Sequence, residues 1–188
     1  MAKARESFKA GQAGLDPRKL VFVDETGTST KMVRVRGRCR KGTRLIGKAP
    51  FGHWKTTTFT AALRYDGLVA PFVLDGPMTG EAFLAYVEKI LAPSLSEGEM
   101  VVIDNLSAHK VKGVRKLIEA RGAKLTYLPP YSPDLNPIEM VFAKLKALLR
   151  KAAERTRDAL WHRIGLLLDA FTPTECANYL AHAGYAPC

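Results

Sequence analysis

Leu20-Val21-Phe22-Val23-Asp24-Glu25-Thr26 is a short apolar, valine-rich run followed by a polar cluster of the kind found in turns. The apolar part predicts a buried strand that ends at Asp24. A second run of the same type, Met100-Val101-Val102-Ile103, ends at Asp104. Because strands in open α/β sheets present functional groups at their carboxyl ends, the two aspartates are candidates for one site.

The spacing of apolar residues around these two runs predicts an α/β fold. Asp66-Gly67 is a favourable hairpin turn, and Asn136 followed by Pro137 is a favourable helix start with Asn136 as the cap. The expected strands cover residues 20–23, 56–63, 68–74, 100–103 and 124–128, and the expected helices cover residues 79–92, 107–121, 136–153, 157–171 and 173–182. This order predicts a mixed five-stranded sheet flanked by helices, with extra helices at the C-terminus.

One domain is expected over residues 20–188, because no long polar linker divides that range. Residues 1–19 have no clear periodicity, and we expect them to form an N-terminal arm or linker. No apolar run approaches the roughly 18 residues that a membrane span requires. The N-terminus also lacks the apolar core of a signal peptide. The sequence therefore predicts a cytoplasmic protein without a membrane partner.

The chain is strongly basic, with 29 Lys and Arg against 18 Asp and Glu, a formal net charge of +11 and a pI near 9.7. A field of this sign attracts polyanions, of which nucleic acid is the commonest. A generally basic soluble protein and a membrane-surface binder are the alternatives that composition alone leaves open.

Residues 31–48 hold eight basic residues and no acidic one. Val33–Arg40 alternates between uncharged residues and arginines. In a strand, alternate residues share a face. One face would then carry the four arginines, and the other Val33, Val35 and Cys39. The four are Arg34, Arg36, Arg38 and Arg40. Two interpretations remain open: a solvated hairpin that the arginines keep soluble, and a ribbon that contacts DNA phosphates.

A third acid, Glu139, lies in the first turn of the helix that Asn136 opens. Taken singly, each acid has a structural explanation, as a turn former or as a partner of the helix dipole. Together, Asp24, Asp104 and Glu139 predict a cluster whose mutual repulsion bound cations would relieve. Oxygen ligands of this kind suit Mg²⁺ or Mn²⁺. Two such ions can promote an in-line attack on phosphorus. Glu25 is adjacent but is expected to point to the opposite face.

Three segments of the sequence resemble the three catalytic motifs of mariner-type DDE transposases. They are Val21-Phe22-Val23-Asp24-Glu25-Thr26, Val102-Ile103-Asp104-Asn105-Leu106-Ser107-Ala108-His109-Lys110 and Leu128-Pro129-Pro130-Tyr131-Ser132-Pro133-Asp134-Leu135-Asn136-Pro137-Ile138-Glu139. The third is the most specific, and the 34 residues between Asp104 and Glu139 are a spacing common in such enzymes. The sequence is most similar to the bacterial insertion-sequence-630 (IS630) group.

This resemblance implies an RNase H-like fold and a catalytic, metal-binding triad of Asp24, Asp104 and Glu139 that holds two Mg²⁺ or Mn²⁺ ions. It implies an endonuclease that cuts transposon ends and joins them to target DNA, working as a homodimer at the bacterial nucleoid. Phe142 stands where the family often has tryptophan. Few residues precede the first strand, so we expect a separately encoded helix-turn-helix half, or else a truncated copy. The alternatives are another RNase H-like nuclease, such as a resolvase, and an inactive DNA-binding fragment.

Several residues near the triad have two interpretations each. Asn105 and His109 are candidates for positioning a phosphate or the attacking water, and equally for satisfying backbone groups. Tyr131 is a candidate for stacking on DNA or for packing in the core. Four cations extend the helix that carries Glu139, either as contacts to the DNA backbone or as a solvated face. These four are Lys144, Lys146, Arg150 and Lys151.

Overall fold

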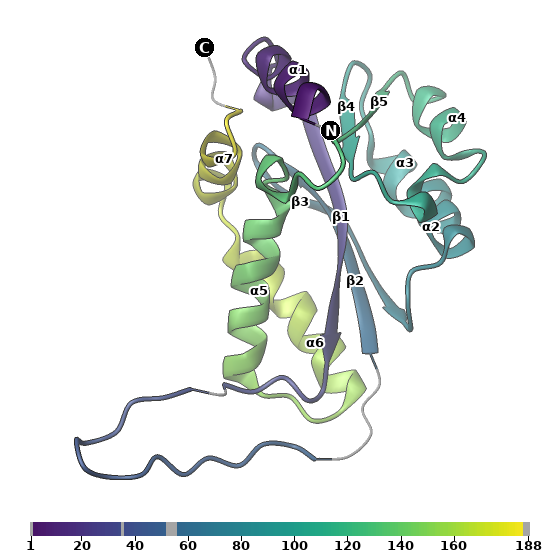
Figure 1. Cartoon of the computed structure of the whole chain (residues 1–188). Helices are drawn as coiled ribbons and strands as arrows, with labels where there is room; N and C mark the ends of the chain where they lie inside the picture. The colour runs from purple at the N-terminus through teal and green to yellow at the C-terminus, as the bar shows by residue number, and fades with distance from the viewer. Residues whose placement is uncertain (1, 35, 52–55, 186–188) are drawn as a thin grey trace.

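The computed structural model describes residues 2–34, 36–51 and 56–185 of the chain. Its centre is a five-stranded sheet in the order β3-β2-β1-β4-β5 (Figure 1). β1 pairs antiparallel with β2 and parallel with β4, so the mixed five-stranded sheet expected from the sequence is confirmed. The strands are β1 Leu20–Ser29, β2 Thr56–Arg64, β3 Gly67–Asp75, β4 Met100–Ile103 and β5 Lys124–Tyr127.

β1 is much longer than the apolar run at its start. The prediction that it ends at Asp24 is wrong, because residues 25–29 continue the ladder with β2, pairing Glu25 with Thr60 and Ser29 with Thr56. Both partners are rich in threonine, a residue that favours strands. The polar cluster that is typical of a turn is therefore the second half of a strand.

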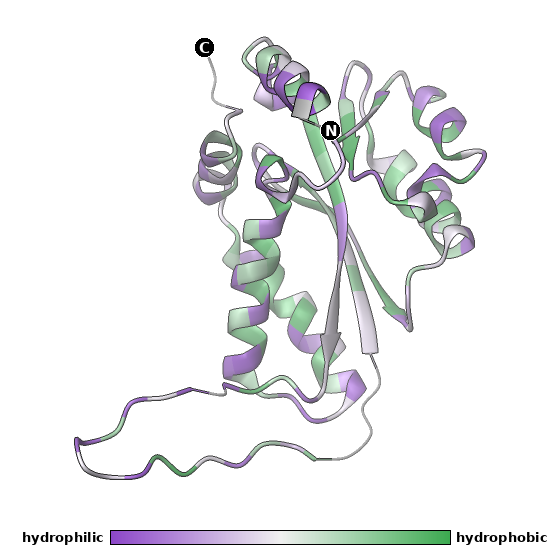
Figure 2. Cartoon of the chain, in the orientation of Figure 1, coloured by the Kyte–Doolittle hydropathy of each residue, from purple (hydrophilic) through white to green (hydrophobic). Residues whose placement is uncertain are grey.

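Helices cover both faces of the sheet (Figure 1). The alternation along β1 divides the core: Leu20 and Phe22 pack in the cluster that contains α5, α6 and α7, whereas Val21 and Val23 pack with α2 and α4. In Figure 2, α5 alternates between apolar and polar colour along its length, as a helix with one buried side does. The helices are α1 Ala2–Gln12, α2 Gly80–Tyr86, α3 Ala92–Ser94, α4 Val114–Glu119, α5 Ile138–Ala152, α6 Arg157–Leu167 and α7 Pro173–His182.

The N-terminal segment, which we expected to be an arm or linker, contains helix α1 and a 3-10 turn at Pro17–Lys19. Gln12 Nε2 donates a hydrogen bond to the Ala183 carbonyl at 2.6 Å, and Phe8 and Leu15 pack against the core. These contacts attach the segment to the C-terminal end of the fold.

The helix expected over residues 107–121 is two separate pieces. Ser107–Lys110 forms a 3-10 turn, and α4 begins only at Val114. Gly113, with a φ of 111°, separates them in a conformation that favours glycine. His109 lies in this 3-10 turn, and its ring contacts Asp104, the residue that follows β4.

The basic segment does not form the expected ribbon. In the described part of residues 32–51 there is no strand or helix, and Arg34, Arg36, Arg38 and Arg40 are all exposed. The segment extends away from the sheet and helices (Figure 1), so its backbone has no strand to pair with. Within the segment, Arg40 and Thr43 enclose a turn in which the Thr43 N–H donates to the Arg40 carbonyl at 3.0 Å. Val35, part of the predicted alternation, lies outside the described residues.

The C-terminal helices are close to those expected, with α6 followed by a 3-10 turn at Leu168–Ala170 before α7. Among the helices of the described residues, none combines the length and apolar character that a membrane crossing requires.

Candidate active site

Asp24 lies within β1 and Asp104 directly follows β4, and these strands are parallel neighbours. Their register ends with Val23 opposite Ile103, so the next residue on each segment is an aspartate. Neighbouring strands lie about 4.8 Å apart, and corresponding positions point to the same side of the sheet. The two carboxylates therefore stand side by side on the α5 side.

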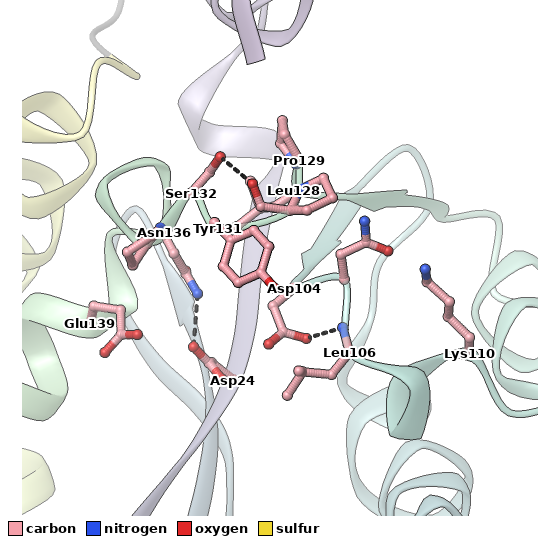
Figure 3. Close-up of a pocket in the computed structure, with 13 residues that line it drawn as sticks. Asp24, Asp104, Leu106, Lys110, Leu128, Pro129, Tyr131, Ser132, Asn136 and Glu139 are labelled. Atoms are coloured by element: carbon pink, nitrogen blue, oxygen red, sulfur yellow. Dashed lines mark hydrogen bonds between the residues drawn. The ribbon is translucent and has the colours of Figure 1, made fainter. Parts of the chain in front are cut away.

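Glu139 comes to the same place from the first turn of α5. Asp24, Asp104 and Glu139 line a single cavity of about 420 Å³, whose wall also includes the stiff loop from Leu128 to Pro133. Figure 3 shows the three carboxylates approaching this cavity from β1, from the end of β4 and from α5. The structure thus brings together the three acids that the sequence singles out. Asn105 lines the same cavity.

Asp24 is buried, with 8% of its surface exposed. Burial raises its pKa to about 7, and the nearby carboxylates of Glu25, Asp104 and Glu139 add to the rise. A hydrogen bond from the Glu25 N–H, at 2.8 Å, acts in the opposite direction. The site therefore opposes the negative charge of Asp24, and a bound cation would remove that opposition.

Asp104 has a histidine partner. His109 is fully buried, its Nδ1 bonds the Asp104 carboxylate, and its Nε2 lies 2.9 Å from Glu25 Oε2. Burial would lower the pKa of His109, but these two carboxylates outweigh it and raise the pKa to about 9. Burial would also raise the pKa of Asp104, but His109 and the Leu106 N–H lower it below its usual value. Asp104 is therefore held as an anion beside a charged imidazole.

Asn136 does not cap α5, and the prediction that it does is wrong. Pro137 occupies the position before the helix and no side chain caps it. The Asn136 side chain turns to the site instead, where its Nδ2 donates to Asp24 Oδ2 at 2.9 Å (Figure 3). The sequence does not reveal this role, because an asparagine followed by a proline and by an apolar helical stripe is equally typical of a helix cap.

The donor set fits a hard divalent cation, because three carboxylates from three elements line one polar cavity and repel one another. In the ranges that the structure describes, no group of three or more Asp, Glu, His or Cys side chains has the arrangement needed to hold a metal ion as it stands. Glu139 is exposed, and no described residue makes a hydrogen bond or ion pair with its carboxylate. Asp24 and Asp104, in contrast, are each held by hydrogen bonds.

The family described as DDE superfamily endonuclease matches residues 19–160, a range that contains Asp24, Asp104 and Glu139. The chain belongs to this family. A comparison with the curated proteins finds no match.

The fold of this DDE superfamily endonuclease is similar to that of Mos1 mariner transposase. The pre-cleavage Mos1 transpososome aligns with a TM-score of 0.79 at 15% identity, covering 97% of this chain and 60% of the Mos1 chain. The Mos1 paired-end complex with Mg gives 0.79 at 13% identity, covering 96% and 58%. The isolated Mos1 catalytic domain gives 0.67 at 12% identity, covering 96% and 85%. The RNase H-like fold expected from the sequence is therefore confirmed, and this chain spans about 60% of the Mos1 chain in the transpososome.

The four cations on α5 of this endonuclease differ in their surroundings. Lys144 Nζ donates to Glu175 Oε2 at 2.6 Å and to the Ala170 carbonyl at 2.7 Å, so it faces the C-terminal helices. Lys146 and Arg150 line a hollow of about 310 Å³ together with the end of β1. Lys151 is exposed. Of the four, Lys146 and Arg150 are those that the structure places beside the strand carrying Asp24.

Tyr131 lies at the mouth of the cavity, not in the core. Its surface is 87% exposed and its φ is 55°, a left-handed value that is uncommon for a residue with a side chain. Such strained residues concentrate at functional sites. The interpretation as core packing is therefore wrong, and the interpretation as a contact to DNA stays a proposal.

Proposed function

We propose that this DDE superfamily endonuclease is a transposase catalytic domain that cleaves transposon ends and joins them to target DNA. The observation that carries the proposal is the single cavity lined by Asp24, Asp104 and Glu139 in a protein with a net charge of +11. The Mos1 transposase structures include a paired-end complex and a strand transfer complex, which supports the same two reactions here. Within the family, we place the chain in the insertion-sequence-630 group.

Asp24, Asp104 and Glu139 would hold two Mg²⁺ or Mn²⁺ ions. When bound, such ions activate the attacking oxygen and neutralise charge on the leaving oxygen. Mos1 structures with Mg and with Mn support the choice of these metals. Because hydrogen bonds hold Asp24 and Asp104, these two would provide the rigid part of the metal site, and the exposed Glu139 would adjust to the ions.

DNA would run from the cavity along α5. Lys146 and Arg150 follow Glu139 by seven and eleven residues, which places all three on nearly the same face of the helix. At 1.5 Å per residue, the two cations lie about 10 and 16 Å from Glu139 along the axis. The exposed Arg34, Arg36, Arg38 and Arg40 extend the positive surface beyond them, and Tyr131 would stack on a base near the cavity.

The remaining partners are proposed from the resemblance of the three motifs to mariner-type transposases, and the Mos1 paired-end complex supports the pairing of two ends. A helix-turn-helix module, separately encoded, would recognise the transposon ends, and two copies of the catalytic domain would act as a homodimer on paired ends. We place the reaction in the bacterial cytoplasm, at the nucleoid. A truncated relic is the alternative that activity measurements address.

The proposal is tested with supercoiled plasmid and with duplexes that carry the ends of the element, in Mg²⁺ or Mn²⁺. The wild type is expected to nick and to join strands, and Asp104→Asn to do neither. Asp169→Asn, which removes an exposed carboxylate, is the matched control and should keep activity. Equal nicking by wild type and Asp104→Asn would refute the assignment. Nicking without joining would indicate another RNase H-like nuclease, and DNA binding without nicking an inactive fragment.

A further inference from the structure

Asn136 connects two elements of the carboxylate site. Its side-chain Nδ2 donates to Asp24 Oδ2 at 2.9 Å, and its backbone carbonyl accepts the N–H of Glu139 at 3.2 Å. The same residue is therefore bonded to the acid on β1 and to the backbone of the acid on α5. Its own N–H donates to the Pro133 carbonyl at 3.0 Å, which joins it to the proline-rich loop.

Asn136 is held in place by burial as well as by these bonds. Only 4% of its surface is exposed, and it lies on the wall of the carboxylate cavity. With the Glu25 N–H on Oδ1 and Asn136 on Oδ2, each oxygen of Asp24 accepts one hydrogen bond and keeps a lone pair for another partner. The orientation of the Asp24 carboxylate is thus set before any ligand arrives.

The other end of the Asn136 amide has no partner. Its Oδ1 is buried, and no described residue donates a hydrogen bond to it. A buried carbonyl oxygen without a donor lowers stability, so proteins seldom keep one without a reason. In a cavity lined by carboxylates, an acceptor of this kind suits a water molecule in the shell of a cation.

We infer that Asn136 is a positioning residue of the metal site: it fixes Asp24 relative to Glu139 and offers Oδ1 to a metal-bound water. This inference rests on the proposed function, since it assumes that the carboxylates hold a divalent cation. A neutral amide suits the role because it donates to Asp24 without adding a fourth negative charge. Partners that orient metal ligands typically change metal affinity by roughly ten- to a hundredfold when they are removed.

The test is calorimetric titration of the metal-free protein with Mn²⁺ alone. Asn136→Leu keeps the size of the side chain but removes its donor and acceptor, and its Kd for Mn²⁺ is expected to rise roughly ten- to a hundredfold. Asn178→Leu, the same change at an exposed position on α7, is the matched control and should leave the Kd within about twofold. Asn136→Ala is the second variant, measured in the same way in case leucine prevents folding.

A purely structural role would lower the melting temperature of the metal-free variant and leave the Kd unchanged. In DNA cleavage, the positioning role predicts a lower kcat with little change in KM. A Kd for either variant within twofold of the wild type would overturn the inference. Failure of the wild type to bind Mn²⁺ would instead refute the metal site in the proposed function, so the two failures are distinguishable.

Discussion

Nε2 of His109 lies 2.9 Å from Oε2 of Glu25, although the two residues are 84 positions apart in the sequence. The ring of His109 packs against Phe83 with centroids 4.3 Å apart, and its Nδ1 bonds Asp104. Because Asp24 and Glu25 point to opposite sides of β1, consecutive residues of one strand serve the site in two ways. Asp24 lines the cavity, and Glu25 supports the histidine that holds Asp104.

His109→Ala is expected to lower the free energy of unfolding by about 3–5 kcal/mol, because it removes a buried charge and leaves Glu25 and Asp104 without their partner. Urea denaturation monitored by circular dichroism measures the change. His162→Ala, at an exposed position, should stay within about 0.5 kcal/mol of the wild type. Similar losses for the two variants would contradict a structural role for the Glu25–His109–Asp104 contact.

Above pH 7, Asp24→Asn is expected to stabilise the metal-free protein by about 1–3 kcal/mol, because it removes a carboxylate whose charge is opposed first by burial and then by the carboxylates of Glu25, Asp104 and Glu139. The Asn136 amide can turn so that its Oδ1 accepts from the new NH2 group. Thermal melts in EDTA measure this gain. Saturating Mg²⁺, at about a hundred times its Kd, should stabilise the wild type by about 2.7 kcal/mol and the variant far less. A variant that melts below the wild type in EDTA would contradict the view that the site opposes the charge of Asp24.

Removing the two cations of the hollow beside β1 should weaken DNA binding in a salt-dependent way. Lys146→Ala with Arg150→Ala is expected to reduce the slope of log affinity against log salt by about 1.8, which corresponds to two phosphate contacts. Fluorescence anisotropy with a duplex across a range of KCl concentrations provides the slope. Lys89→Ala with Lys116→Ala removes the same charge from exposed positions on the other side of the sheet and is the control. Equal slopes for the two double variants would contradict specific phosphate contacts by Lys146 and Arg150, because net charge alone would then explain the change in affinity.

Tyr131→Ala should weaken DNA binding by about 1–3 kcal/mol through the loss of one stacking contact. Its stability should hardly change, because the side chain is 87% exposed. Tyr131→Phe keeps the ring and should bind DNA as the wild type does, which anisotropy titrations at fixed salt can compare. Loss of binding in the phenylalanine variant would point to the hydroxyl instead of the ring.

The parts of the fold that could be predicted from sequence are those fixed by local pattern. The apolar runs before Asp24 and Asp104 predicted the first half of β1 and all of β4, and the resemblance of three motifs singled out three acids that line one cavity. The second half of β1 could not be predicted, because its strand character comes from pairing with β2 and not from its own polar residues. The prediction of a strand that carries the four arginines is wrong for the opposite reason. The alternation of residues suits a strand, but among the described residues no other strand pairs with this segment.

The supporting residues of the site were harder to predict than the acids themselves. Asn136 has the sequence context of a helix cap, and only the position of β1 across from it decides where its amide points. The importance of Glu25 depends on its contact with His109, which is 84 residues away and lies in a 3-10 turn where the sequence predicts a continuous helix. Such long-range contacts leave no periodic signal in the sequence.

Because side chains along β1 alternate between the two faces of the sheet, the site depends on the number of residues that precede Asp24 in the strand. Since side chains alternate with a period of two, a single residue inserted between Leu20 and Asp24 would turn Asp24 toward Phe83 and the side of His109. With an uncharged insertion the chain would keep every acid and the net charge, and yet Glu25 in place of Asp24 would point to the α5 side of the sheet. The number of residues in this strand segment, and not only their apolar character, therefore decides which carboxylate enters the cavity.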